Sequence, residues 1–132
     1  MRAVITEKIP LIPPETLFCL FREKDFFVWL DTCLTGHTRK EYSVVAFEPF
    51  LTFKSKGKKI TICEGEDKKS FFGNPLEYLN DLLTQYNIQC PSFFAPGAFG
   101  YFSYDLGWQI EKLPDIGVDD LHLPDICLGF YD

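Results

Sequence analysis

The clearest alternation of apolar and polar positions lies in the middle of the chain, on either side of Gly57. Residues 50–56 and 58–63 alternate apolar with polar side chains, and Gly57 separates the two runs. Successive side chains of a strand point to opposite faces, so this pattern predicts a β-hairpin with one face on a core and the other in water. Lysines keep such an exposed hairpin soluble. The lysines around this turn are Lys54, Lys56, Lys58 and Lys59.

Two segments carry the signals of amphipathic α-helices. Pro13 and Pro14 precede a helix that we expect to end near Lys24. Asn74 and Pro75 open a second helix, because asparagine caps a first turn and proline fits the first helical position. The inner face of the first helix is expected to be Leu17, Phe18, Leu20 and Phe21, and that of the second Leu76, Leu79, Leu82, Leu83 and Tyr86.

Short apolar runs between turn residues predict further strands. Residues 26–30 indicate a buried strand, and residues 42–47 indicate another, which ends at Pro49. The polar residues 35–40 and the charged residues 64–69 are typical of loops. The first half of the chain is therefore expected to consist mainly of short strands after one helix.

The aromatic-rich run from Gly97 to Tyr104 alternates in the way expected of a strand buried on both faces. Asp105 can cap a short helix over residues 106–111, because its carboxylate accepts from the free amides of a first turn. Pro114 is expected to end that helix. Residues 126–131 predict a last strand.

Strands outnumber helices in this pattern, and no strand–helix–strand unit with a phosphate loop occurs. The sequence therefore predicts an α+β fold, mostly antiparallel sheet with flanking helices. No stretch rich in serine, glycine or proline is long enough to divide the chain. We expect one domain over residues 1–132.

Charge and composition narrow the classes of partner. The formal net charge of -6 at pH 7 argues against the basic surface that nucleic acids require. No apolar run reaches the ~20 residues of a membrane span, and the Met1 end lacks the charged-then-apolar order of a signal peptide. The five cysteines are scattered and never form Cys-x-x-Cys, which indicates neither a disulfide framework nor a zinc site. We expect a reduced cytoplasmic protein with no nucleic-acid and no membrane partner.

Few residues offer chemistry of their own. Gly97, Gly100 and Gly107 lack the spacing of a phosphate loop, and glycines in a crowded strand typically let another backbone approach. His37, four residues after Cys33, is a weak hint of a catalytic pair. Magnesium prefers carboxylates, but acidic residues among prolines are typical of solvated turns. Those acids are Asp115, Asp119, Asp120 and Asp125. We therefore predict no catalytic residue and no metal site in this chain.

A set of short motifs resembles one enzyme family. The motifs are Trp29-Leu30-Asp31-Thr32, Tyr42-Ser43, Glu48-Pro49, Gly100-Tyr101-Phe102, Tyr104-Asp105, Leu113-Pro114, Leu123-Pro124-Asp125 and Phe130-Tyr131-Asp132. Together they resemble the N-terminal region of component I of the chorismate-utilising amino-synthases, aminodeoxychorismate synthase and anthranilate synthase. The chain departs from the family pattern at Pro96, at Glu41 and at Trp108-Gln109, where arginine is common.

The resemblance implies both a fold and an activity. Members of the family pack two antiparallel sheets together with helices outside, so this chain would supply half of that body, and a chorismate-binding domain would follow. The full-length enzyme of the aminodeoxychorismate branch aminates chorismate to 4-amino-4-deoxychorismate for p-aminobenzoate and folate synthesis. It uses magnesium and ammonia from a glutamine amidotransferase subunit. This chain alone would then be an inactive scaffold, without a cofactor of its own.

The resemblance also implies a surface and a ligand site. Fourteen phenylalanines exceed the needs of a small isolated core, so we expect an exposed apolar patch well above ~600 Å², covered by the rest of component I or by a homodimer. The loop that forms a tryptophan pocket in the family corresponds to residues 30–42. The residues expected to bind the amino acid are Asp31, Thr32, Arg39, Lys40, Glu41 and Tyr42.

Two other interpretations stay open. In the anthranilate branch the same domain would be a tryptophan feedback sensor. Alternatively, the chain is a free-standing binding module that keeps the fold without the enzyme.

Overall fold

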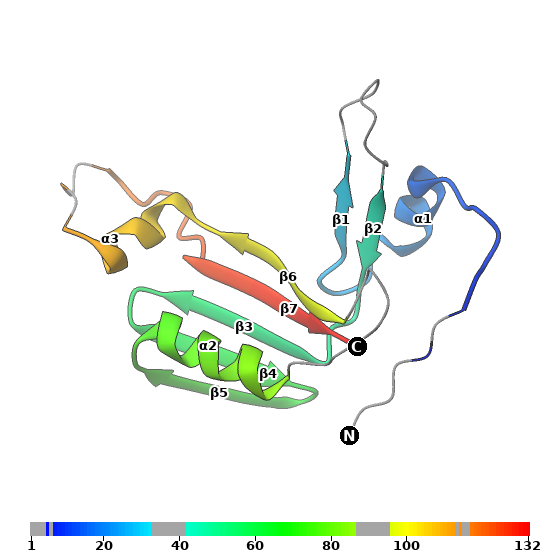
Figure 1. Cartoon of the computed structure of the whole chain (residues 1–132). Helices are drawn as coiled ribbons and strands as arrows, with labels where there is room; N and C mark the ends of the chain where they lie inside the picture. Colours follow the sequence, from blue (N-terminus) through cyan, green and yellow to red (C-terminus); the bar gives the residue numbers. More distant parts are fainter. Residues whose placement is uncertain (1–4, 6, 33–41, 87–95, 113, 115–116) are drawn as a thin grey trace.

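The computed structural model describes residues 5, 7–32, 42–86, 96–112, 114 and 117–132. Within them the chain forms a five-stranded sheet, a two-stranded sheet and three α-helices (Figure 1). The strand order of the larger sheet is β5-β4-β3-β7-β6, and each neighbouring pair is antiparallel. The predicted α+β class with antiparallel pairing is confirmed.

The elements follow one another in a simple order. The smaller sheet pairs β1 (Val28–Asp31) with β2 (Ser43–Ala46). The larger sheet contains β3 (Leu51–Lys56), β4 (Lys59–Glu64), β5 (Asp67–Phe72), β6 (Gly97–Phe102) and β7 (Ile126–Tyr131). The helices are α1 (Pro14–Phe21), α2 (Pro75–Gln85) and α3 (Gly107–Ile110), and a 3-10 turn, Tyr104–Leu106, precedes α3.

The hairpin predicted around Gly57 is confirmed. Strands β3 and β4 pair from Leu51↔Glu64 to Lys56↔Lys59, and Gly57 turns between them with φ of +53°. Phe53 and Ser55 are buried on one face, whereas Lys54 and Lys56 are exposed on the other. The alternation of apolar and polar residues along β3 therefore correctly predicted which side chains face the core and which face water.

Helix α2 covers the buried face over β3, β4 and β5 (Figure 1). The Asn74 side chain caps it by accepting from the backbone amides of Leu76, at 3.1 Å, and Glu77, at 3.4 Å. The resulting core consists of Leu51, Phe53, Ile60, Ile62, Leu79, Leu82, Leu106, Ile126, Leu128 and Phe130. Leu83 was predicted to belong to the inner face, and that is wrong. Leu83 is 45% exposed. It lies on the flank of the helix opposite to Tyr78, and the Tyr78 ring is the one that packs on the sheet, with its centroid 4.9 Å from that of Phe71.

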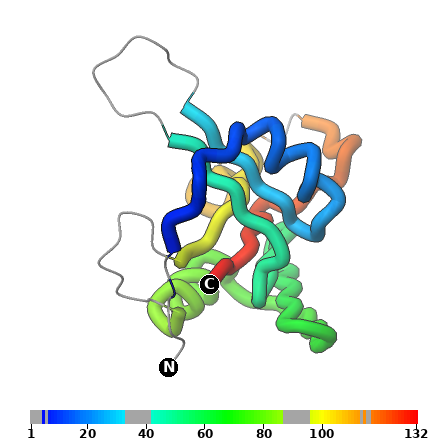
Figure 2. The backbone as a smooth tube through the Cα atoms, turned by 90° about the vertical axis from the view of Figure 1, so that its right-hand side faces the viewer, coloured from blue at the N-terminus to red at the C-terminus, as the bar shows by residue number. Residues whose placement is uncertain are grey.

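The two-stranded sheet packs against α1 rather than against α2. Phe18 contacts Phe27 and Trp29, with ring centroids 5.8 and 5.7 Å apart, and Phe21 stacks on Phe47 at 4.5 Å. The side view shows α1 on the outer surface of this pair (Figure 2). The predicted buried strand over residues 26–30 is wrong in extent and burial, because β1 starts at Val28 and has a single neighbouring strand, which leaves it half-buried or exposed.

The predicted charged loop over residues 64–69 is wrong. Strand β4 continues to Glu64, Gly65 turns with φ of +58°, and β5 begins at Asp67. Because β5 lies at an edge of the sheet, its main chain pairs with β4 while its charged side chains stay in water. Charge at this position indicates an edge strand.

The predicted burial of residues 97–104 on both faces is also wrong for the described part of the chain. Strand β6 lies at the other edge of the sheet, where Tyr101 is 40% and Phe102 55% exposed. Asp105 does not cap a helix; it lies inside the 3-10 turn, and no side chain caps that turn or α3. The 3-10 turn begins at Tyr104, one residue before Asp105, so Asp105 lies too late in the sequence to cap it.

Candidate functional site

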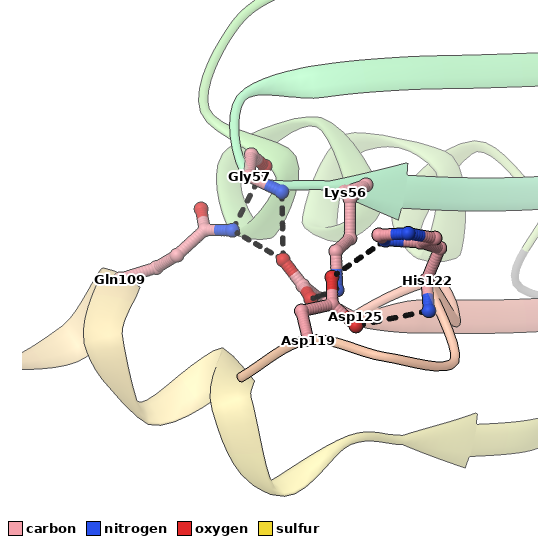
Figure 3. A network of polar contacts seen from close by, with 6 residues as sticks. All are labelled: Lys56, Gly57, Gln109, Asp119, His122 and Asp125. Carbon is pink, nitrogen blue, oxygen red and sulfur yellow. Dashed lines mark hydrogen bonds and ion pairs between the residues drawn. The ribbon is translucent and has the colours of Figure 1, made fainter. Parts of the chain in front are cut away.

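The best-defined polar group of the described residues surrounds Asp125, whose side chain is buried at the end of the larger sheet (Figure 3). Its Oδ2 atom accepts from the Gly57 amide at 2.7 Å and from Gln109 Nε2 at 3.2 Å, and Lys56 Nζ lies 3.4 Å from Oδ1. Gln109 Nε2 also donates to the Gly57 carbonyl at 2.8 Å. A buried carboxylate requires such partners, because an unpaired one would be strongly destabilising.

A second, exposed acid extends this group. Asp119 Oδ2 lies 2.7 Å from Lys56 Nζ, and Asp119 Oδ1 accepts from the His122 amide at 2.9 Å. The hydrogen bond with Asp119 is the main cause that raises the pKa of Lys56, and the same bond lowers the pKa of Asp119. Both groups are therefore charged at neutral pH.

Main-chain bonds explain why the loop places Asp125 here. Its amide donates to the Ser55 carbonyl, and its carbonyl accepts from the Ser103 amide, both at 2.7 Å. The residue thus bridges the ends of β3 and β6 just before β7 begins, with Pro124 fixing the backbone ahead of it. The motif Leu123-Pro124-Asp125 holds the ends of three strands together.

This arrangement pairs every charge that it contains within the fold. Asp125 and Asp119 share the Lys56 ammonium, and no group of three His, Cys, Asp or Glu that could hold a metal occurs among the described residues. The prediction of solvated turns is wrong for Asp125, because Gly57, Lys56 and Gln109 together bury its carboxylate. Lys56 likewise has acidic partners instead of being only a solubilising charge.

The predicted amino-acid site lies at the open end of the β1–β2 pair. The Thr32 amide and hydroxyl both donate to the Tyr42 carbonyl, at 3.2 and 3.1 Å. The Ser43 hydroxyl donates to Asp31 Oδ1 at 2.5 Å. Asp31, Thr32 and Tyr42 are all exposed. The structure thus brings these three predicted residues together, whereas Arg39, Lys40 and Glu41 lie outside the described residues, as do Cys33 and His37.

The sequence did not predict an open cleft of about 500 Å³ on the face of the larger sheet opposite α2, next to the segments that precede β1 and follow β2. Phe26 and Glu48 line it, and both have φ of +52°, a conformation that few residues other than glycine adopt. The Phe26 ring and the Glu48 carboxylate each contact a lysine. Lys54 Nζ lies 4.9 Å from the centre of the Phe26 ring, and Lys24 Nζ lies 2.6 Å from Glu48 Oε1. No sequence signal predicted these backbone conformations.

Comparison with known proteins identifies the family. The chain is 35% identical over 101 residues, 73% of its length, to aminodeoxychorismate synthase component 1 of Escherichia coli (strain K12). It is 32% identical over 122 residues, 89% of its length, to the same protein of Klebsiella aerogenes. It is also 32% identical over 123 residues, 90% of its length, to anthranilate synthase component 1 of Acetivibrio thermocellus. The chain belongs to this family of synthase component 1 proteins.

The match to the component 1 family covers most of this chain but a small part of each relative. The chain spans 22%, 27% and 25% of the three relatives, about a quarter of their length. No protein-family model matches it. None of the described helices is long and apolar enough to cross a membrane.

Proposed function

We propose that this chain is the N-terminal scaffold and regulatory domain of an aminodeoxychorismate synthase component I. The complete subunit would aminate chorismate to 4-amino-4-deoxychorismate for p-aminobenzoate and folate synthesis. The observation that carries the proposal is the 35% identity to the Escherichia coli aminodeoxychorismate synthase component 1 over 73% of the chain. The continuation Asp105-Leu106-Gly107 supports the same branch.

The same proposal includes a division of labour within the subunit. It is supported by the ion pairs of Lys56 with buried Asp125 and exposed Asp119, which give both carboxylates a partner inside this chain. The chain would contribute scaffold and partner-facing surface, while magnesium binding and chorismate chemistry belong to the remainder of component I. A glutamine amidotransferase subunit would supply ammonia.

Cytoplasmic location is part of the same proposal. Cys19, Cys63 and Cys127 are free thiols in the described structure. Unpaired cysteines persist in a reducing compartment. The cytoplasm is where a folate-pathway enzyme of this kind would act.

A regulatory amino-acid site is the second part of the proposal. Asp31, Thr32 and Tyr42 lie together at the end of the β1–β2 pair, and Arg39, Lys40 and Glu41 lie between Thr32 and Tyr42 in the sequence. A carboxylate and a hydroxyl can accept from the ammonium group of tryptophan, and a tyrosine ring offers an aromatic wall. Calorimetry with millimolar tryptophan on the complete subunit tests this site. Heat that disappears in Tyr42→Ala supports it, and no heat at all removes it.

The anthranilate branch is the second candidate function. The relative from Acetivibrio thermocellus, an anthranilate synthase component 1, matches 90% of the chain at 32% identity. In that case the same region would sense tryptophan as a feedback inhibitor.

Product analysis distinguishes the two branches. The complete subunit that contains this chain is incubated with chorismate, magnesium and ammonia, and the product is identified by mass spectrometry. We expect 4-amino-4-deoxychorismate and growth of a p-aminobenzoate auxotroph that expresses the subunit. Anthranilate as the product, with rescue of a tryptophan auxotroph, would assign the other branch. The 132-residue chain alone should convert no chorismate, and conversion by it would contradict the scaffold role.

A further inference from the structure

The two edges of the larger sheet differ in charge. Strand β5 reads Asp-Lys-Lys-Ser-Phe-Phe, with its first four residues exposed. Strand β6 reads Gly-Ala-Phe-Gly-Tyr-Phe and carries no charged residue. Natural proteins protect free sheet edges with charges, especially lysine, because an unprotected edge pairs with any available strand. Strand β5 has this protection and β6 lacks it.

The outward backbone groups of β6 can be assigned from its pairing with β7. The Ser103 amide donates to the Asp125 carbonyl, and this pair continues the register of Phe102↔Ile126. Hydrogen-bonded residues alternate in an antiparallel pair. Ala98, Gly100 and Phe102 therefore turn their amide and carbonyl groups away from β7, toward the open edge. Within the described residues β6 pairs only with β7.

Exposed apolar side chains continue from this edge. Phe102 is 55% exposed, Tyr104 93%, Trp108 42% and Ile110 70%. These residues follow one another along the end of β6, the 3-10 turn and α3 (Figure 1). By contrast, the open face of the sheet over β3 and β4 is polar, with Lys54, Lys56 and Lys59 exposed. Four exposed large apolar residues thus lie on or directly after β6, whereas β5 has Phe72, which is 80% exposed at the end of that strand.

We propose that the open edge of β6 pairs, main chain to main chain, with a strand from the part of component I outside this chain. The proposal rests on the proposed function, because it assumes a complete subunit. The relatives are about four times as long as the part that this chain spans, so most of each subunit is available to supply the strand. The residues from Phe102 to Ile110 would be covered by the same polypeptide.

A strand of the same polypeptide is favoured over a second copy of this chain. A strand of the same polypeptide is tethered, and the loop-closure entropy that it loses grows only slowly with the length of the connection. A second copy must also lose translational and rotational freedom, which costs several kcal/mol. Edge pairing between copies is therefore an outcome that the test must detect.

Hydrogen exchange on the complete subunit and on the 132-residue chain tests the pairing. In the chain alone, the amides of Ala98, Gly100 and Phe102 should exchange rapidly. In the complete subunit they should be slowed at least about 100-fold. The amide of Ser70, which faces outward from β5 by the same alternation, should exchange rapidly in both. Rapid exchange of all three β6 amides in the complete subunit would overturn the proposal.

A matched pair of proline variants separates pairing from folding. Proline at an outward position of an edge strand removes no bond of the existing ladder. Ala98→Pro should lower the melting temperature of the complete subunit more than that of the chain alone, whereas Ser70→Pro should change both by the same small amount. Equal effects of Ala98→Pro on both proteins would count against the proposal.

Two further outcomes identify other occupants. Slow exchange of the three amides in the chain alone, together with a dimer in sedimentation, would show that a second copy occupies the edge and would overturn the assigned partner. Formation of anthranilate by a complete subunit with protected β6 amides would refute the aminodeoxychorismate assignment but leave the edge pairing intact.

Discussion

The β5 side and the β6 side of the larger sheet differ in their covering helix, in their charge and in their exposed apolar side chains. On the β5 side, α2 covers the buried face, lysines cover the open face and charges protect the edge. On the β6 side, α2 is absent, the edge is uncharged and large apolar side chains are exposed (Figure 1). This difference between the two edges is the basis of our proposal that the remainder of component I pairs with β6.

On the β6 side, we expect the largest loss of unfolding free energy from a substitution at Gly100. This residue has φ of +154°, and a Cβ atom there would lie 2.0 Å from the Cys127 carbonyl oxygen. Gly100→Ala should therefore cost roughly 3–5 kcal/mol of unfolding free energy, measured by urea titration. Gly57→Ala is the control. Gly57 has φ of +53°, but a Cβ atom added there would meet nothing within 4 Å, so about 1 kcal/mol is expected. Equal losses would contradict the close approach of β6 and β7.

We expect the second-largest loss of stability from removal of the buried Asp125 carboxylate. Asp125→Ala leaves the Gly57 amide and the Gln109 side chain without their acceptor, which should cost about 3 kcal/mol in urea unfolding. The exposed neighbour Asp120 provides the control, and Asp120→Ala should stay within about 0.5 kcal/mol. A neutral Asp125→Ala variant would show that the network does not hold the strand ends together.

A charge at each edge sharpens the comparison. Phe102→Lys should destabilise the complete subunit by about 2 kcal/mol more than the chain alone, because the side chain is buried only when the edge is covered. Phe72, 80% exposed at the end of β5, offers the matched position, and Phe72→Lys should not distinguish the two proteins. Thermal unfolding of the four variants measures both effects, and the same response at both edges would remove the asymmetry.

A single hydrogen bond between β7 and the segment before β1 should contribute less to stability than the Asp125 network. The Tyr131 hydroxyl donates to the Phe26 carbonyl at 2.7 Å, and burial raises the pKa of Tyr131 to about 12. Tyr131→Phe should cost about 1 kcal/mol. Because the folded-state pKa lies above the ordinary value of 10.0, this contribution is present below pH 10 and is lost as the pH rises toward 12. Ultraviolet titration of the phenol checks the pKa, and titration at its ordinary value would contradict the buried position.

The ion pair of Lys56 and Asp119 should give the smallest effect. The pKa of Asp119 is lowered from 3.8, so the contribution is present above that value and is lost as the pH falls through the lowered pKa. The pKa of Lys56 is raised from 10.5, so the contribution persists below that value and is lost as the pH rises through the raised pKa. The stability difference between the native chain and Lys56→Met should thus be flat around neutral pH and shrink at both extremes. A difference that changes between pH 6 and 8, on the order of a tenfold change in the equilibrium, would implicate another group.

Local signals predicted the parts of the fold that depend on neighbours in sequence. The hairpin around Gly57 and the cap at Asn74 are set by adjacent residues, and both predictions are confirmed. Strand β5 was missed because its charges, typical of loops, also suit a sheet edge. The exposure of β6 could not be read from its aromatic alternation, because burial depends on which strands and helices lie beside it.

The polar network illustrates a second limit. Asp125 meets Gly57 across a sequence separation of 68 residues, and Gln109 across 16. No local pattern reports such a contact, so the acid was expected to be solvated. The family motif Leu123-Pro124-Asp125 marked the position but not its role. For the amino-acid site, the sequence indicated Asp31, Thr32 and Tyr42, which the structure places together, and their ligand remains a prediction.

The experimental structure of the complete subunit tests the central claim most directly. We predict a strand from outside this chain hydrogen-bonded to the amide and carbonyl groups of Ala98, Gly100 and Phe102, with no strand at the outer edge of β5. A complete subunit in which the β6 edge is bare and Phe102 stays in water would contradict the account.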